Sequence, residues 1–220
     1  MVPMVKVKIC GITRLEDALV AADAGADAVG FIFVEGTPRY VEPGRAASFI
    51  AALHPFICAV GVFWDHPTSH IRAVAEECGL GAVQFHGSEP PEAVAASPLP
   101  VLKTVKVAGP EDLKLLDGYE PAAFLLDSPA RWSEGERRAP IPWLLARAAA
   151  TRGRIILSAG LTPENVGEAV RVARPWGVDV NSGVEATPGR KDPDRVRRFV
   201  RAARASADKL ADDLPEDARG

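Results

Sequence analysis

The chain has 220 residues, of which 47% are hydrophobic and 25% charged, a composition that excludes disordered and fibrous proteins. Its formal net charge of −3 gives no general reason to expect a nucleic-acid partner, which basic surfaces usually bind. No apolar stretch is long enough to span a bilayer and none resembles a secretory signal, so we expect a cytoplasmic protein without a membrane partner.

The first part of the chain sets a repeating pattern. The segment VKVKIC (5–10) is short and β-branched, as in a strand, and TRLEDALVAADAG then changes to helical periodicity. Thr13 and Glu16 have the spacing of a capping box, and Gly25 stands where a helix end favours positive φ. The apolar run ADAVGFIFV (26–34) suits a strand that is buried on both faces of a parallel sheet.

The same alternation continues along the chain. Further strands are predicted at FICAVGVFW, GAVQFHG, VLKTVKV, AAFLLDS, GRIILSAG and GVDVNS, and helices at about 43–54, 68–78, 90–96, 110–117, 142–150, 162–173 and 192–205. Thr162 before Pro163 is the clearest helix start, because proline at the first helical position fixes φ without losing a hydrogen bond.

Eight strand–helix units without a linker predict one compact α/β domain, a (β/α)8 barrel over residues 1–206. A doubly wound open sheet is the alternative architecture. Residues 207–220 are acidic and lack a sustained apolar stripe, so we expect them to form a disordered tail.

Two titratable side chains end predicted strands, where a barrel of this kind has its active site. On position alone, Cys10 is more often inert packing, and Asp127 is as well explained as a turn cap. A thiol near a cation such as Lys8, which shares its strand face, can nevertheless act as a base, and a partly desolvated carboxyl as an acid. Such a pair suits a proton-transfer isomerisation that needs no metal or cofactor. Cys58 and Cys78 are expected to be inert.

Small residues end the last two strands. The segments SAGL (158–161) and NSGVE (181–185) would let backbone N–H groups converge on an anion, and loops after strands 7 and 8 often bind phosphate in barrels. The alternative is that their glycines only make tight turns. His86 is equally well read as a substrate contact or as a polar strand-end residue, and no second histidine accompanies it in a metal-like spacing.

Together these motifs resemble the phosphoribosylanthranilate isomerase family of tryptophan biosynthesis. The resemblance runs from residue 6 to about residue 204 and rests on KICGIT, DALVAADAGADAVGFIF, TPRYV, GVF, VQFHG, LLD, GLTPENV and VDVNSGVEATPGRKD. KICGIT together with SGVE and PGRKD is the most specific part. The resemblance implies a TIM barrel that acts on a small phosphorylated substrate, needs no cofactor and exists as a monomer or homodimer.

The resemblance also implies residue roles. The family converts N-(5-phosphoribosyl)anthranilate into 1-(2-carboxyphenylamino)-1-deoxyribulose 5-phosphate, an Amadori rearrangement, with a cysteine base and an aspartate acid. Carried over by motif, Cys10 is the base and Asp127 the acid, and Arg39 meets the anthranilate carboxylate. The phosphate is then held by Gly160, Ser182 and Gly183.

The sequence departs from the family pattern in three places. The loop at 128–142 lacks the family's glycine run, Ala159 replaces a glycine, and Asn181 replaces a serine. Ala159 keeps its backbone N–H for phosphate, and the change at Asn181 is expected to matter little. The altered loop makes a divergent paralogue acting on a related sugar phosphate one alternative, and a catalytically silent phosphosugar-binding barrel is another. A Schiff-base aldolase that uses Lys103 or Lys106 of a central strand is a fourth possibility.

Overall fold

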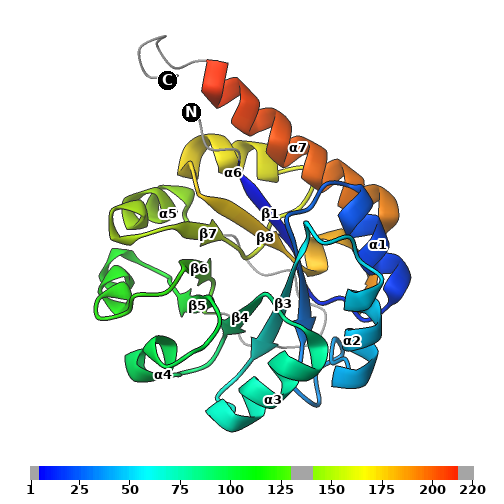
Figure 1. Ribbon diagram of the computed structural model, residues 1–220. Helices are drawn as coiled ribbons and strands as arrows, with labels where there is room; N and C mark the ends of the chain where they lie inside the picture. Colours follow the sequence, from blue (N-terminus) through cyan, green and yellow to red (C-terminus); the bar gives the residue numbers. More distant parts are fainter. Residues whose placement is uncertain (1–4, 130–140, 213–220) are drawn as a thin grey trace.

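The computed structural model describes residues 5–129 and 141–212, with side chains up to residue 208. Eight parallel strands pair in sequence order and close into a barrel (Figure 1). They are β1 (Lys6–Ile9), β2 (Ala28–Ile32), β3 (Cys58–Phe63), β4 (Ala82–Phe85), β5 (Val101–Lys106), β6 (Ala123–Asp127), β7 (Ile155–Leu157) and β8 (Gly177–Val180). Because β1 pairs with β8 from Lys6↔Gly177 to Ile9↔Val180, the predicted barrel is confirmed and the open sheet was the wrong alternative.

Helices surround the strands on the outside of the barrel (Figure 1). They are α1 (Leu15–Asp23), α2 (Pro43–Ala51), α3 (Thr68–Cys78), α4 (Pro91–Ala95), α5 (Trp143–Ala149), α6 (Val166–Ala173) and α7 (Pro193–Asp212). Between β5 and β6 the predicted helix is a 3-10 helix, η1 (Pro110–Leu116). Two more short 3-10 turns are η2 (Ala150–Arg152) and η3 (Ser182–Val184). No helix within the described ranges is long and apolar enough to cross a membrane.

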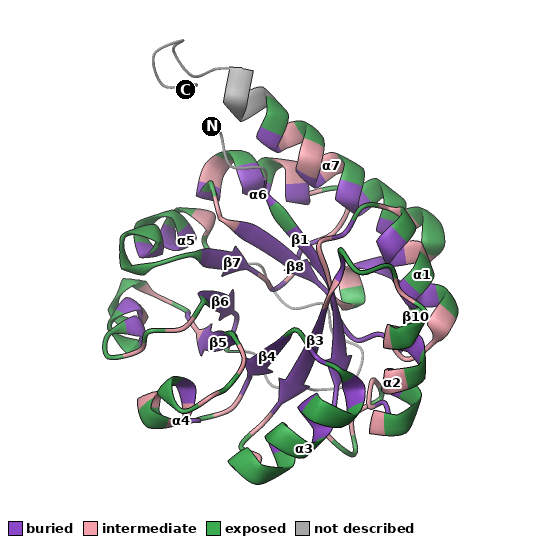
Figure 2. Cartoon of the chain, in the orientation of Figure 1, coloured by how far each residue is buried: buried purple, intermediate pink, exposed green. Residues whose placement is uncertain are grey.

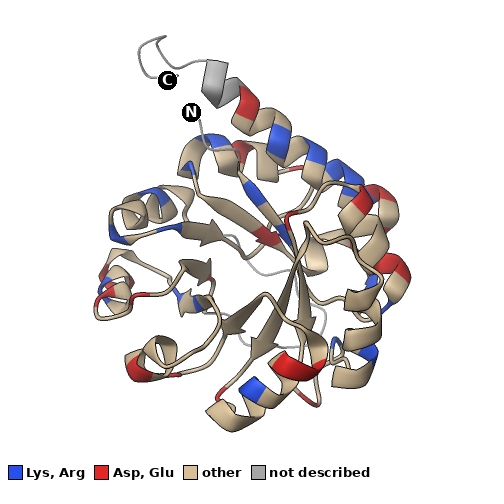
Figure 3. Cartoon of the chain, in the orientation of Figure 1, with Lys and Arg blue, Asp and Glu red and all other residues tan. Residues whose placement is uncertain are grey.

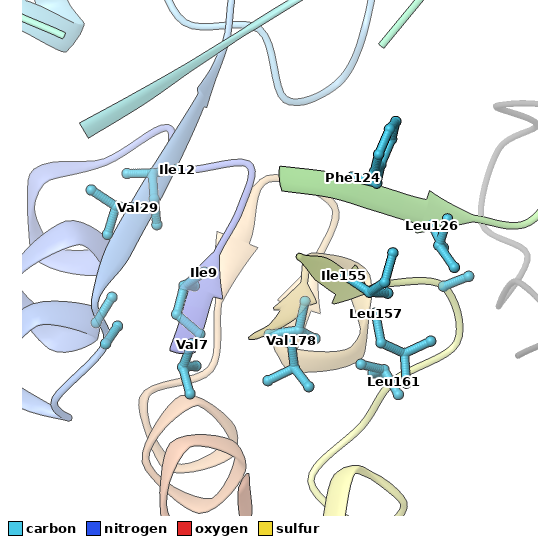
Figure 4. Packing of buried hydrophobic residues seen from close by; sticks show 14 of the residues in the cluster. Val7, Ile9, Ile12, Val29, Phe124, Leu126, Ile155, Leu157, Leu161 and Val178 are labelled. Atoms are coloured by element: carbon cyan, nitrogen blue, oxygen red, sulfur yellow. The ribbon is translucent and has the colours of Figure 1, made fainter. Parts of the chain in front are cut away.

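Each strand buries both of its faces (Figure 2), as its continuous apolar sequence predicts. The outward side chains pack against the helices in one large cluster, in which Val7 and Ile9 of β1 lie near Val178 of β8 (Figure 4). A separate apolar cluster fills the interior and consists of Val60, Ala82, Leu102, Ala123, Leu125 and Ile156. Since successive side chains of a strand alternate, Lys8 and Cys10 point inward where Val7 and Ile9 point outward.

The start of α6 and the cap of α1 differ from those predicted. The first regular residue of α6 is Val166, because the Asn165 side chain accepts a hydrogen bond from the Thr162 N–H at 2.8 Å and closes a turn before the helix. Thr13 makes no capping box in α1, since its hydroxyl donates to the Gly189 carbonyl instead. Gly25 does follow α1 with φ of +89°, as predicted.

The last helix is longer than predicted. The domain boundary placed at residue 206 falls inside α7, which continues to Asp212. Its buried stripe of Val196, Phe199, Val200 and Ala203 extends to Ala207, which is 7% exposed, so the chain stays helical past the boundary. Residues 213–220 of the predicted tail lie outside the described residues.

Candidate active site

Cys10 lies directly after β1, at the carboxyl end of the barrel. Its N–H donates to the Val180 carbonyl at 2.8 Å, and the residue is 5% exposed. The thiol packs against Ile32 and Val62 inside the barrel. A Cβ at Gly30 of β2 would stand only 2.8 Å from the Cys10 Sγ, so the absence of a side chain at Gly30 makes room for the thiol.

Charged side chains surround this thiol. Lys8 Nζ lies 2.9 Å from Asp179 Oδ1, and Ser158 Oγ donates to Asp179 Oδ2 at 3.3 Å. Burial raises the pKa of Cys10; the Lys8 ammonium opposes this, Asp179 adds to it, and Lys191 opposes it, with a raised pKa as the net result. The thiol is thus held in a desolvated site whose cations favour the thiolate.

Asp127 ends β6 and is 1% exposed. Its Oδ1 accepts a hydrogen bond from the Ser128 N–H at 2.9 Å, and its Oδ2 lies 3.7 Å from His86 Nε2. His86 Nδ1 lies 3.2 Å from both Gln84 Nε2 and Thr104 Oγ1. When Nδ1 accepts from the Gln84 amide, the ring proton is on Nε2 and faces the carboxylate. The predicted site residue His86 therefore lies beside the predicted acid.

Arg39 is held by a carboxylate that sequence reasoning did not single out. Its Nε donates to Glu185 Oε1 at 2.8 Å and its Nη2 to Glu185 Oε2 at 2.6 Å. Lys191 Nζ contacts the same Oε1 at 3.1 Å and Asn181 Oδ1 at 2.9 Å. Burial raises the pKa of Glu185, but the hydrogen bond from Arg39 and the charge of Lys191 outweigh it and hold that pKa below its usual range.

Glu185 and Lys191 are carried by a small antiparallel pair, β9 (Glu185–Thr187) and β10 (Arg190–Lys191), which the sequence did not predict. The pair folds back so that Lys191 N donates to Asp17 Oδ2 of α1 at 3.0 Å. The only sequence signal for this cluster was the motif SGVEATPGRKD itself, in which acidic and basic residues stand close together.

The loops after β7 and β8 meet, as the phosphate hypothesis requires. A Cβ at Gly183 would overlap the Leu161 carbonyl oxygen, so only glycine allows the two loops to approach this closely. The Asn165 Nδ2 donates to the Gly160 carbonyl at 2.9 Å and holds the first loop. Gly160, Gly183 and its neighbour Ser182 are thus brought to one place at the carboxyl ends of β7 and β8.

Ala159 has φ of +65°, in the left-handed region that favours glycine. We expect Ala159→Gly to raise the free energy of unfolding by about 1 kcal/mol, because the strain of a Cβ in this conformation is removed. Thermal unfolding would show an increase in Tm of about 2–4 °C. The matched control is Ala148→Gly on the exposed side of α5, which should lower the stability by about 1 kcal/mol. An equal loss in both variants would contradict the assigned strain.

The two lysines considered for a Schiff base have other contacts. Lys103 Nζ donates to Glu89 Oε2 at 2.8 Å and to the Gly87 carbonyl at 2.7 Å, so it ties the loop after β4 to the barrel. Lys106 Nζ lies 4.6 Å from the centre of the Trp64 ring. Among the side chains that the structure describes, in residues 5–129 and 141–208, no group of three or more His, Cys, Asp or Glu is placed to hold a metal ion.

Comparison with known proteins gives one consistent family. The family model described as N-(5'-phosphoribosyl)anthranilate isomerase matches residues 7–202. A curated protein of that name from Pelobacter propionicus is 47% identical over 201 residues, which cover 91% of this chain and 96% of the relative.

Solved structures agree with this match. The crystal structure of phosphoribosyl anthranilate isomerase from Thermotoga maritima is 42% identical, with a TM-score of 0.85, and the match covers 92% of this chain and 100% of that one. A structure of phosphoribosyl anthranilate isomerase in complex with reduced 1-(o-carboxyphenylamino)-1-deoxyribulose 5-phosphate is 41% identical over the same shares, with a TM-score of 0.82.

Proposed function

Because the chain belongs to the N-(5'-phosphoribosyl)anthranilate isomerase family of tryptophan biosynthesis, we propose that Cys10 is the general base and Asp127 the general acid of its reaction. The observation that carries this assignment is the placement of a buried thiol and a buried carboxyl at the carboxyl ends of β1 and β6. Because the strands of the closed barrel are parallel, the carboxyl ends of β1 and β6 lie at the same mouth, and only β7 and β8 lie between them on the shorter way round.

The reaction begins with opening of the ribose ring. Asp127 gives its proton to the ring oxygen, the bond from C1 to that oxygen breaks, and the nitrogen lone pair of anthranilate completes a protonated Schiff base. Cys10, as the thiolate, then takes the proton from C2. The electrons of that C–H bond form the C1–C2 double bond and neutralise the nitrogen, which gives the enolamine. Tautomerisation to the ketone completes the rearrangement.

The two ends of the substrate would be held by separate groups. Arg39 would bind the anthranilate carboxylate, since a guanidinium has five N–H donors and its contact with Glu185 does not preclude a second carboxylate. Backbone N–H groups at Gly160, Ser182 and Gly183 would bind the phosphate where the two loops meet. His86, beside Asp127, would contact the reacting sugar.

The function is tested by following the loss of fluorescence of phosphoribosylanthranilate made in situ. We expect the purified protein to accelerate this loss, and to work on this substrate in the cytoplasm. Failure to do so while the protein still binds reduced 1-(o-carboxyphenylamino)-1-deoxyribulose 5-phosphate would favour the silent binder. A protein that neither accelerates the loss nor binds this compound would favour a paralogue with another phosphosugar substrate.

The phosphate site gives a separate prediction. We expect Gly183→Ala to raise KM at least about tenfold, because the new Cβ would force the loop of β8 away from Leu161 and weaken anion binding. Steady-state kinetics and binding of inorganic phosphate as a competitor would measure the effect. The matched control is Gly44→Ala in α2, where a Cβ meets only Glu77 at 3.7 Å. An unchanged KM in Gly183→Ala would remove this loop from the phosphate site.

A further inference from the structure

A buried ion pair crosses the seam where the barrel closes. Lys8 of β1 and Asp179 of β8 are register partners, and their side chains are 4% and 6% exposed. In Figure 3 the corresponding basic and acidic segments of the two strands lie side by side. A buried pair of this kind is a poor source of stability, since desolvation offsets the attraction and apolar side chains of similar volume often serve as well. Stability alone therefore does not explain a lysine at this position.

The end of the Lys8 side chain shares a niche with the Cys10 thiol. Both residues point into the barrel from β1, one above the other. Both side chains pack against Gly30 of β2. A Cβ added to Gly30 would lie 2.8 Å from Cys10 Sγ and 3.2 Å from Lys8 Cε, so both occupy space that a larger residue would fill. The lysine thus reaches past Gly30 and places its ammonium next to the thiol.

The other charges near the thiol come from β8 and β10. Asp179 faces the thiol from β8 and opposes thiolate formation, but its carboxylate is hydrogen bonded to the Lys8 ammonium at 2.9 Å. Lys191 of β10 adds a second cation, which is itself held by Glu185 at 3.1 Å. Of these two cations, Lys8 has the larger effect on the pKa of the thiol.

We propose that Lys8 is a positioning residue whose ammonium stabilises the thiolate form of Cys10, with Asp179 fixing the ammonium in place. This inference deepens the proposed function and rests on Cys10 being the base. The charge and the hydrogen bond of Lys8 both lower the pKa of the Cys10 thiol against the effect of burial. Burial lowers the pKa of Lys8, but the charges of Asp179 and of the Cys10 thiolate outweigh it and raise that pKa, so the lysine stays charged over the working pH range.

The test is a titration of the thiolate that does not depend on activity. The absorbance near 240 nm of the protein, minus that of its Cys10→Ser counterpart, reports Cys10 ionisation as pH is raised. We expect Lys8→Gln to move the midpoint up by at least about one pH unit, the scale of losing an adjacent opposite charge. The rising limb of the pH profile of kcat/KM should move to higher pH by the same amount, because the base must be deprotonated to act.

Two further variants separate positioning from folding. Lys8→Gln combined with Asp179→Asn removes both charges of the buried pair. The thiol of this double variant should still ionise at a higher pH than that of the parent, because the charge of Lys8 affects it more than the charge of Asp179. Lys6→Gln, at the exposed end of the same strand, should leave both the midpoint and kcat/KM unchanged. A midpoint within about 0.3 pH units of the parent in the folded Lys8 variants would overturn the proposal. Since the titration is independent of turnover, an inactive parent enzyme would contradict the proposed function without affecting this readout.

Discussion

Cys10→Ser should lower kcat by at least about 100-fold, the usual scale for losing a positioned base. The hydroxyl occupies the space of the thiol beside Gly30, so the barrel should keep its fold and its substrate site. A serine hydroxyl is a far weaker acid than a thiol, however, and no oxyanion would form to take the C2 proton. Steady-state kinetics with phosphoribosylanthranilate measure the effect, and KM should change much less than kcat.

The control for this variant is Cys58→Ser. Cys58 begins β3 at the opposite end of the barrel from Cys10 and is half-buried, so its substitution should leave turnover unchanged. A loss of turnover in both variants would indicate a general effect of removing thiols. Near-normal turnover in Cys10→Ser alone would remove Cys10 from the role of base.

Asp127→Asn should also lower kcat by at least about 100-fold, because an amide of the same size cannot deliver a proton to the ring oxygen. The amide oxygen can still accept the hydrogen bond from the Ser128 N–H, so the strand end should stay in place. Calorimetric binding of reduced 1-(o-carboxyphenylamino)-1-deoxyribulose 5-phosphate should therefore be retained. The combination of intact binding and lost turnover is the signature expected of a missing acid.

Asp117→Asn is the matched control, because this carboxylate is 63% exposed, pairs with Arg152 and lies outside the barrel mouth. Its turnover should equal that of the parent. If Asp127→Asn also kept its turnover, the proton would have to come from another group, and His86 at 3.7 Å would be the first to test.

Much of the fold followed from periodicity. Long apolar runs separated by amphipathic segments predicted eight strands in order, and the pairing of β1 with β8 confirms the closed barrel. The ends of these strands then placed Cys10 and Asp127 at one mouth, because parallel strands of a barrel end on one side. Most helix starts were also predicted to within a residue. Thr162 was the exception, because a hydrogen bond between its N–H and the Asn165 side chain makes a turn there and α6 begins at Val166.

The polar part of the site could not be predicted in the same way. Strands of two or three residues, such as β9 and β10, are too short to show any periodicity. The ion pair between Arg39 and Glu185 joins residues 146 positions apart, and nothing in either local sequence specifies its partner. Such pairs are set by the closed barrel, which brings the ends of distant strands together, and so they appear only in three dimensions.

The Lys8–Asp179 pair has a consequence for how the chain folds. The two residues are 171 positions apart, so the contact forms only when the last strand of the barrel meets the first. Before that moment β1 carries a lysine on the face that must become the interior, and a desolvated cation without its partner disfavours premature collapse. Contacts of such long sequence separation form late, since the entropy of closing the loop opposes them. Ring closure and the assembly of the charged niche around Cys10 are then the same event, and enzymatic activity would report complete closure of the barrel.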